Sequence, residues 1–227
     1  MIEGEKDLRA RLARVGKLMW DEGLTGKKSL YLSGGNISAR IPGTDHILIK
    51  PTGLCLGLLK PEELIIIDEN GRVLSRKGKP SVETPMHTAI YRTRKDVEGI
   101  VHGHSLYCGV FGLAGIELLP LVYGGGITPE LMNGVRIVPW GEIGSRELGD
   151  SVAEELKERN AALLEFHGSV AVGKTIEEAY HLASKLEELA EYQWRVMVLG
   201  KKPKLLPATV RRTIFEGVRE DADSIHS

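Results

Sequence analysis

The sequence is poor in several features that mark particular classes of protein. Its 227 residues include only two cysteines, Cys55 and Cys108, which stand far apart and form no Cys-x-x-Cys motif. This excludes a disulfide-stapled fold, and we expect reduced thiols. No apolar run approaches the ~20 residues of a membrane span. Nothing before residue 30 resembles a positively charged leader with an apolar run. These absences predict a cytoplasmic protein without membrane partners.

An excess of charge of one sign is also missing. Lysine and arginine number 30 against 31 acidic residues, which gives a formal charge of -1. No strong field for polyanions follows, so nucleic acid and anionic membrane surfaces are excluded as expected partners. Repeats and low-complexity segments are absent as well. The length fits one domain, which we expect over residues 1–200. Residues 201–227 are expected to form a tail with a short helix at 210–218 and a mobile end.

The hydrophobic pattern predicts helices and strands that alternate. Apolar residues recur at helical spacing in residues 5–22, and Gly23 is expected to end this helix. The period then changes to that of strands at 30–41, 46–50 and 64–68. Further strands are predicted at 118–123, 135–138, 161–166 and 169–172. Further helices are predicted at 85–94, 106–113, 145–159 and, from a capping box at Thr175, 176–199.

The most informative stretch is residues 99–105, where β-rich apolar residues lead into two histidines. His102 and His104 are two positions apart, and the period of a strand places both imidazoles on one side of the backbone. Such a pair can bind one metal ion. Gly103 permits a close backbone approach, and Ser105 can cap a following helix. Taken alone, the pair is equally compatible with two hydrogen-bonded histidines at a strand end.

Two other segments favour the metal interpretation. A buried strand ends at His167-Gly168, which repeats the His-Gly pattern at a place where α/β folds gather reactive groups. Glu83 precedes Pro85 at the start of a predicted helix, where the helix dipole favours a carboxylate. Glu83 is therefore either a capping acid or a base at the mouth of a site. The second interpretation requires a fold that brings it to the histidines.

Two loops in the first half have the composition of an anion site. Residues 33–36 read Ser-Gly-Gly-Asn, and residues 50–53 read Lys-Pro-Thr-Gly. Free backbone N–H groups beside hydroxyl or amide side chains form concave nests that hold phosphate. Neither loop is a P-loop, and each taken singly also fits a plain turn.

Together these motifs resemble the class II aldolase/adducin family, and most closely its L-fuculose-1-phosphate aldolase-like members. The resemblance rests on five ordered segments and covers residues 5 to about 200: Ser-Gly-Gly-Asn-Ile-Ser at 33–38, Lys-Pro-Thr-Gly at 50–53, Pro-Ser-Val-Glu at 80–83, His-Gly-His at 102–104 and Phe-His-Gly at 166–168. It implies a three-layer α/β/α fold with a central, mainly antiparallel sheet and helices on both faces. It also implies a homotetramer with active sites at subunit interfaces.

The resemblance further implies a role for each site residue. Zn²⁺ is expected on His102, His104 and His167, with Glu83 as the acid/base residue that can also serve as a fourth ligand. The sugar-phosphate site maps onto Asn36, Thr52, Gly53 and Ser81. Tyr123, donated by a neighbouring subunit, is expected to protonate the aldehyde oxygen. Imidazole ligands also suit Co²⁺, Fe²⁺ or Mn²⁺. His87 falls where such proteins often carry histidine, and no chemistry is assigned to it.

The implied reaction is the reversible cleavage of a ketose 1-phosphate, similar to L-fuculose 1-phosphate, into dihydroxyacetone phosphate and an aldehyde through a metal-stabilised enediolate. Alternatives on the same scaffold are dehydration of a methylthioribulose phosphate, 4-epimerisation, decarboxylation and pyruvate-type aldol chemistry. Glu83 disfavours the epimerases, which usually carry aspartate there. The three histidines disfavour an adducin-like module. One departure is Val82, where sugar-phosphate members commonly carry a second serine; Lys50 or Lys79 can replace that hydroxyl.

Overall fold

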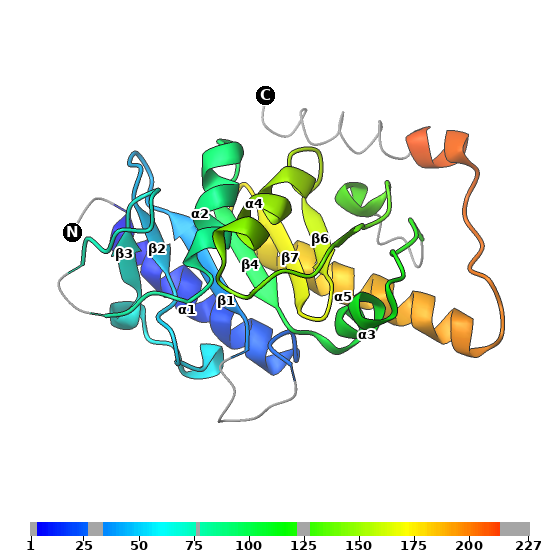
Figure 1. The fold of residues 1–227 in the computed structure, drawn as a ribbon, viewed down its shortest axis with the longest axis horizontal. Helices are drawn as coiled ribbons and strands as arrows, with labels where there is room; N and C mark the ends of the chain where they lie inside the picture. Colours follow the sequence, from blue (N-terminus) through cyan, green and yellow to red (C-terminus); the bar gives the residue numbers. More distant parts are fainter. Residues whose placement is uncertain (1–3, 27–33, 76–77, 122–127, 214–227) are drawn as a thin grey trace.

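The computed structural model describes residues 4–26, 34–75, 78–121 and 128–213. Within them, a seven-stranded sheet runs through the centre in the order β3-β2-β1-β4-β7-β6-β5 (Figure 1). Neighbouring strands are antiparallel except β5 and β6, which are parallel. The mainly antiparallel sheet is thus confirmed. The strands are β1 Asn36–Arg40, β2 Ile47–Ile49, β3 Ile65–Ile67, β4 Gly99–Gly103, β5 Ile137–Val138, β6 Ala161–Leu164 and β7 Gly168–Gly173.

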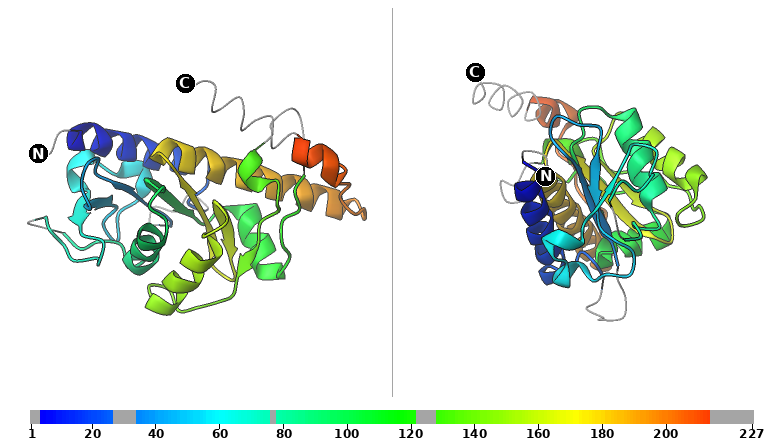
Figure 2. Two further views of the ribbon diagram at one scale, coloured as in Figure 1. Left: turned by 90° about the horizontal axis from the view of Figure 1, so that it is seen from above. Right: turned by 90° about the vertical axis from the view of Figure 1, so that its left-hand side faces the viewer.

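Helices cover both faces of this sheet, as predicted. The α-helices are α1 Glu5–Asp21, α2 Thr84–Thr93, α3 Leu106–Ala114, α4 Arg146–Glu155 and α5 Ile176–Val198, with 3₁₀ turns at 56–58, 61–63 and 129–131. The long helices α1 and α5 lie along one face, and α2 and α4 pack together on the other (Figure 2). α3 packs against α5. The predicted helices are all present, although α4 ends before the predicted residue 159.

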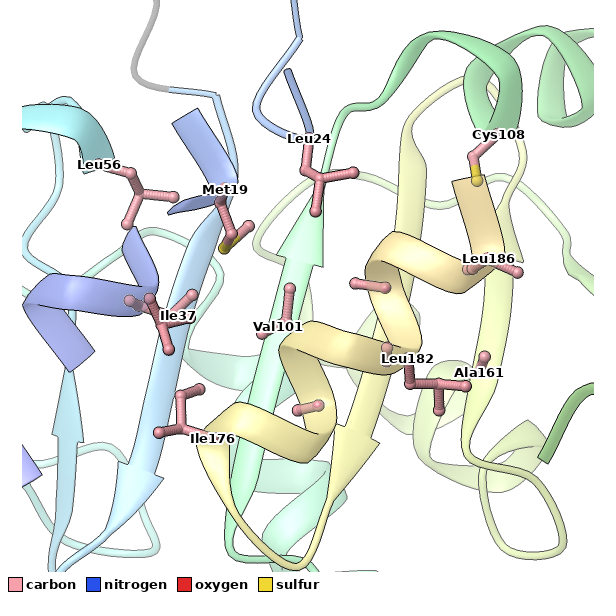
Figure 3. Close-up of a cluster of buried hydrophobic side chains, with 14 of the residues drawn as sticks. Met19, Leu24, Ile37, Leu56, Val101, Cys108, Ala161, Ile176, Leu182 and Leu186 are labelled. Carbon is pink, nitrogen blue, oxygen red and sulfur yellow. The ribbon is translucent and has the colours of Figure 1, made fainter. Parts of the chain in front are cut away.

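In β2, β4, β6 and β7, successive apolar residues alternate between two apolar cores. In β4, Val101 belongs to the core beneath α1 and α5, together with Ile37 of β1 and Leu182 of α5 (Figure 3). Its neighbour Ile100 belongs to the core beneath α2 and α4. His102 is two residues beyond Ile100, so its side chain lies on the α2 side of the sheet. Strand geometry therefore fixes the face that carries the first candidate ligand.

Residues 118–121 do not form the strand that the sequence predicts at 118–123. Among these four residues only Leu118 pairs, in an isolated bridge, and Pro120 has no N–H for a ladder. Gln193 of α5 binds the nearby backbone instead. Its Oε1 accepts from Leu119 N (2.7 Å), and its Nε2 donates to the carbonyl of Glu117 (2.9 Å). The following residues 122–127, which include Tyr123, lie outside the described part of the chain.

The chain leaves α5 at Gly200, which has a φ of 69° and ends the helix as predicted. Residues 208–213 are helical and overlap the start of the short helix predicted at 210–218. The remainder of that prediction lies outside the described residues. None of the helices described combines the length and the apolar character needed to cross a bilayer.

Candidate metal centre

Strand pairing brings the candidate residues to one end of the sheet. Asn36 of β1 lies directly opposite His102 of the neighbouring β4. On the other side of β4, Ser169 of β7 lies opposite Gly103, and His167 sits in the turn that leads into β7. Because the strands are antiparallel, the start of β1, the end of β4 and the start of β7 all meet at this edge. The N-terminus of α2 adds Glu83.

Four potential ligands converge there. One ligand atom from each of Glu83, His102, His104 and His167 lies within 4.8 Å of the others. The Nε2 atoms of His102 and His104 are 2.8 Å apart. Glu83 Oε2 is 3.2 Å from His102 Nε2, and Glu83 Oε1 is 3.4 Å from His167 Nε2. The structure therefore brings together the three histidines and the carboxylate that the resemblance assigned to a metal.

The hydrogen bonds leave these atoms available for a cation. His102 Nδ1–H donates to the Ser169 carbonyl (2.9 Å), which orients the ring with Nε2 toward the other candidate ligands. Glu83 Oε1 and both ring nitrogens of His167 are buried, and no hydrogen-bond partner for them lies in the described part of the chain. Buried polar atoms without partners are rare because they cost free energy. A metal ion on this donor set accounts for Glu83 Oε1 and for one ring nitrogen of His167, and three imidazoles with an adjacent carboxylate suit a catalytic zinc site.

Burial also sets the protonation states that ligation needs. Desolvation lowers the pKa of His104 to about 3 and that of His167 to about 4, so both rings are neutral at neutral pH. Burial alone would raise the pKa of the Glu83 carboxyl. The neighbouring rings of His102 and His167 and the Asn36 amide outweigh it, and that pKa lies below its ordinary value. Glu83 is therefore a carboxylate at neutral pH.

The side chain of Glu83 is not a helix cap. Glu83 is the N-cap residue of α2, but no hydrogen bond from the described backbone reaches its carboxylate. The capping interpretation of the sequence is therefore wrong, and the role of Glu83 as a base stays a prediction. The second oxygen of the carboxylate, Oε2, accepts a hydrogen bond from Asn36 Nδ2 at 2.8 Å.

Two glycines allow the backbones at this site to pack closely. A Cβ on Gly103 would lie 2.6 Å from the carbonyl oxygen of Leu24, and His104 N donates to the same oxygen (2.8 Å). The close approach predicted at Gly103 is confirmed. A Cβ on Gly168 would lie 2.2 Å from the Gly103 carbonyl, so this position also requires glycine. Both glycines thus hold the histidine-bearing segments together.

The helix after His104 is capped differently from the sequence prediction. Ser105 is the N-cap residue of α3, but its hydroxyl donates to Glu187 Oε2 of α5 (2.7 Å) instead of capping the helix. The Glu187 carboxylate itself accepts from the backbone N–H groups of Tyr107 (2.8 Å) and Cys108 (2.9 Å). A partly buried carboxylate at a helix N-terminus is favourable for both groups. Glu187 therefore ties α5 to the segment that carries His104.

The Lys-Pro-Thr-Gly loop at 50–53 lies beside the loop that precedes Glu83. The backbone N–H groups of Thr52 and Ser81 donate to carbonyls of the facing loop at 3.0 and 3.1 Å. Gly53 has a φ of 76°, which glycine adopts readily. The Ser81 hydroxyl accepts from Glu83 N (3.2 Å). Thr52, Gly53 and Ser81 thus belong to two paired loops, the second of which leads into Glu83.

A buried cation lies in the same region. Lys50 is only 2% exposed, and among the described residues it forms no ion pair. Burial lowers the pKa of its ammonium group to about 8, so most of it remains protonated at pH 7. By contrast, Val82, where the resemblance to sugar-phosphate members implies a serine, is 55% exposed. Lys50 therefore supplies positive charge next to the loop that lacks the hydroxyl.

Sequence reasoning assigned no role to His87, yet it lies close to the centre. Its Nε2 is 2.5 Å from Asn36 Oδ1, and its Nδ1 is 2.6 Å from Ser38 Oγ. One sequence signal was the spacing of four between Glu83 and His87 on a single helix face. The other was the alternation of polar residues at 36, 38 and 40 in a strand that is buried throughout. Matching these two patterns requires knowing that α2 packs on β1.

An α/β fold with three histidines and a carboxylate at the ends of its central strands is typical of a class of metal-dependent enzymes. The family model described as "Class II Aldolase and Adducin N-terminal domain" matches residues 10–194, and the chain belongs to this family. It is 33% identical over 212 residues to the 5-deoxy-D-ribulose 1-phosphate aldolase of Bacillus thuringiensis serovar kurstaki, with 92% of this chain and 95% of that protein covered.

Other comparisons agree with this assignment. The chain is 37% identical over 174 residues to the L-fuculose phosphate aldolase of Methanococcus maripaludis, which covers 75% of this chain and 90% of that protein. A solved structure of an L-fuculose 1-phosphate aldolase superposes with a TM-score of 0.82 at 25% identity over 94% of this chain and 96% of the other. The chain is therefore an enzyme of the aldolase class, a lyase, and its predicted fold is confirmed.

Proposed function

We propose that this chain is a zinc-dependent class II aldolase that reversibly cleaves a ketose 1-phosphate into dihydroxyacetone phosphate and an aldehyde. The observation that carries the proposal is the position of Glu83 Oε1. This oxygen is buried, has no hydrogen-bond partner among the described residues and lies 3.4 Å from His167 Nε2. A carboxylate held beside a cation site, with one oxygen free, is suited to move a proton next to a carbonyl group.

His102, His104 and His167 would hold the ion, and Glu83 can add a fourth ligand when substrate is absent. Zinc fits this donor set, and Co²⁺, Fe²⁺ or Mn²⁺ also accept imidazole ligands. When bound, the ion supplies Lewis-acid stabilisation for negative charge on the donor half of the substrate.

Glu83 would carry the proton in both directions. In cleavage, the C4 hydroxyl gives its proton to a base, the role predicted for Tyr123, the bond between C3 and C4 breaks, and the electron pair passes toward the C2 carbonyl to give an enediolate and the aldehyde. Glu83, which holds a proton at this stage, gives it to C3 and completes dihydroxyacetone phosphate, and it takes up another proton from solvent before the next cleavage. In condensation, the Glu83 carboxylate removes that C3 proton again. The assignment of Tyr123 to the aldehyde oxygen stays a prediction, since this residue lies outside the described part of the chain.

The proposed phosphate site combines Thr52, Gly53 and Ser81 with the buried cation of Lys50. The neighbouring hydrogen-bonded loops and the burial of Lys50 support it. Phosphate held there would position the reacting carbons and so convert binding energy into rate. The role that the resemblance gave Asn36 in this site stays a prediction, because its amide is hydrogen-bonded to Glu83 and His87.

The names of the relatives suggest the substrate class. One acts on 5-deoxy-D-ribulose 1-phosphate and another on L-fuculose phosphate. Both sugars are deoxy ketoses that end in a methyl group, and cleavage between C3 and C4 leaves a short aldehyde with that methyl terminus. We therefore include a small, methyl-terminated aldehyde in the proposal.

The proposed assembly is a homotetramer with active sites at subunit interfaces. Large apolar side chains on α3 and just after α5 support an interface, with Leu113 64% and Leu199 74% exposed. Light scattering on the purified chain tests the assembly. Cys55 and Cys108 are both free thiols, which agrees with the proposed location in the reducing cytoplasm.

The test is an assay on purified protein whose metal content is known from elemental analysis. The panel contains L-fuculose 1-phosphate, 5-deoxyribulose 1-phosphate and methylthioribulose 1-phosphate. Release of dihydroxyacetone phosphate supports the proposal, whereas loss of water without carbon–carbon cleavage indicates a dehydratase and overturns it.

Replacement of the base provides a second test. The Glu83→Gln variant is expected to retain metal but to lose at least about 100-fold in hydrogen exchange at C3 of dihydroxyacetone phosphate, because an amide cannot accept that proton. Exchange at the wild-type rate in a metal-loaded Glu83→Gln variant would remove Glu83 from this role.

A further inference from the structure

A seam of buried polar side chains runs between α2 and β1 and ends at the metal centre. Asn36 and Ser38 are two positions apart on β1, so both side chains face α2. His87 and Tyr91 are four positions apart on α2, so both face β1. All four are at most 4% exposed. Glu83, one further helical step before His87, lies at the end of the seam. We call these four residues the polar seam.

Hydrogen bonds link the polar seam into one chain. Asn36 Nδ2 contacts Glu83 Oε2 (2.8 Å), and Asn36 Oδ1 contacts His87 Nε2 (2.5 Å). His87 Nδ1 then contacts Ser38 Oγ (2.6 Å), which contacts the Tyr91 hydroxyl (2.9 Å). Each contact has the length of a normal or short hydrogen bond.

The chemistry of the groups fixes the direction of every bond. A carboxylate can only accept, so the Asn36 atom facing Glu83 must be the amide nitrogen. The Asn36 oxygen then faces His87, whose Nε2 must carry a proton. Burial lowers the pKa of His87 to about 3, so the ring is neutral and Nδ1 accepts from Ser38. Burial raises the pKa of Tyr91, which therefore keeps its proton and donates to Ser38. All donors point toward Glu83.

This arrangement prevents the Asn36 amide from turning over. If the amide turned, its oxygen would face the Glu83 carboxylate and its nitrogen would face an N–H group of His87. With the amide held, Glu83 Oε2 is always occupied by a donor, while Oε1 is the oxygen without a partner among the described residues. The seam thus selects which carboxylate oxygen is free to take a proton.

We propose that His87 is a positioning residue that acts through Asn36 to hold Glu83 with Oε1 directed at the reacting carbon. The proposal rests on the proposed aldolase function, because it explains how the acid/base group of that reaction is oriented. The hydrogen bonds of the His87 ring go to Asn36 and Ser38, and we assign His87 no contact with the metal ion or the substrate. Its effect is on the orientation of Glu83, and so on turnover more than on substrate binding.

Replacement of the ring by a group without donors tests this directly. In the full-length, metal-loaded His87→Phe variant, we expect kcat and C3 hydrogen exchange to fall about 10- to 100-fold, the range expected for a misplaced catalytic group. KM should change less than about threefold, because the phosphate loops are untouched. His87→Gln, whose amide can donate to Asn36 Oδ1, should regain most of the lost rate.

A second variant keeps the test decisive if His87→Phe does not fold. Ser38→Ala removes the donor to His87 Nδ1 with a minimal change of volume, and we expect kcat to fall about 3- to 10-fold. The matched control is Thr88→Val on the same helix. Thr88 is buried, but its hydroxyl bonds only to carbonyls of its own helix turn in the described structure, so the rate should stay within about twofold. Wild-type kcat in both seam variants, or no rescue by glutamine, overturns the proposal.

A measurement independent of activity separates this inference from the proposed function. In ¹⁵N-histidine-labelled full-length protein, long-range proton–nitrogen spectra should show His87 as the neutral tautomer with its proton on Nε2. The signal is assigned by its loss in His87→Gln. A proton on Nδ1 would reverse the hydrogen-bond chain and end the proposal. Failure of the wild-type protein to cleave any ketose 1-phosphate would overturn the proposed function, while the tautomer would still decide the role of the His87–Asn36 bond.

Discussion

Single residues near the metal centre are held in states that destabilise the fold, and Lys50 is one of them. Its ammonium group is buried without an ion pair among the described residues, and burial lowers its pKa to about 8 from an ordinary value of 10.5. The unfolded chain therefore binds more protons than the folded chain between those two pKa values. In that window the free energy of unfolding must rise with pH, and below it the full penalty applies.

The Lys50→Met variant should remove this penalty. We expect its free energy of unfolding at pH 7 to exceed that of the wild type by roughly 1–3 kcal/mol, since a shift of this size corresponds to about 3 kcal/mol at most. The variant should also lose the increase in stability between pH 8 and 10.5, and its KM for a sugar phosphate should rise. Urea denaturation at pH 7 and 9.5 measures the first effects. A less stable variant would show that the ammonium has a partner in the folded protein.

Phe166 is a second residue in a costly state. It directly precedes His167, has a φ of 55° and is 59% exposed. A left-handed conformation costs a residue with a bulky side chain roughly 1–2 kcal/mol, whereas asparagine adopts it more readily.

We expect Phe166→Asn to raise the free energy of unfolding by about 0.5–1 kcal/mol and to retain the metal, because the turn itself is unchanged. Phe166→Ala is the matched control, since it removes the ring but keeps the Cβ that clashes, and it should give no such gain. Thermal and urea denaturation measure both variants. Equal stabilisation by alanine would assign the effect to the exposed ring and not to the backbone.

At the scale of elements, α3 depends on a carboxylate supplied by α5. Glu187 accepts from two backbone N–H groups of the first turn of α3 and from Ser105, directly after His104. Replacing it by glutamine removes the charge and puts an amide donor against backbone donors.

The Glu187→Gln variant should therefore be less stable by about 1–3 kcal/mol. We also expect weaker metal binding, because the segment that carries His104 is anchored by this cap. Glu188→Gln is the control one position along, where the side chain is 43% exposed and pairs with Lys185, so its effect should be within about 0.5 kcal/mol. Urea denaturation and competition with a chelator measure the two quantities. Similar losses in both variants would contradict the capping role.

Most elements of this fold could be predicted because their patterns are local. The helical periodicity of α1 and α5, the capping box at Thr175 and the strands that end in histidine all lie within short windows of sequence. The described part of the strand predicted at 118–123, residues 118–121, is not a strand, and the reason is non-local. Its apolar residues suit a strand, but Pro120 cannot join a ladder, and the hydrogen-bonding partner of the segment is Gln193 on a distant helix.

The candidate site could be predicted only in part for the same reason. The spacing of His102 and His104 follows directly from strand geometry, so their convergence was a local prediction. The bond between Asn36 and His87 joins residues that are 51 positions apart and depends on which face of β1 meets α2. No spacing rule within the sequence contains that information. Likewise, Ser105 was predicted to cap α3 because the competing carboxylate, Glu187, is 82 positions away.

At the scale of the whole molecule, the metal centre lies at the ends of the central strands β1, β4 and β7, outside the two apolar cores. The apolar clusters beneath α1 and α5 and beneath α2 and α4 contain none of the three histidines. Each fully buried leucine or isoleucine in them contributes roughly 1.5–3 kcal/mol. We therefore expect the fold to survive without metal, while the metal adds stability because it binds only the folded chain.

The His102→Ala variant tests this separation of fold and site. It should keep the circular dichroism spectrum of the wild type but contain less than about a tenth of the zinc, because a three-histidine site loses a ligand. Added zinc at about 100 times its dissociation constant should stabilise the wild type by about 2.7 kcal/mol and leave the variant unchanged. His181→Ala, an exposed histidine on α5, is the control and should retain both zinc and its stabilisation. If His102→Ala unfolds while the metal-free wild type stays folded, the His102 ring itself stabilises the fold, independently of the metal. If the metal-free wild type also unfolds, the ion is structural, and the edge of the sheet is part of what holds the molecule together.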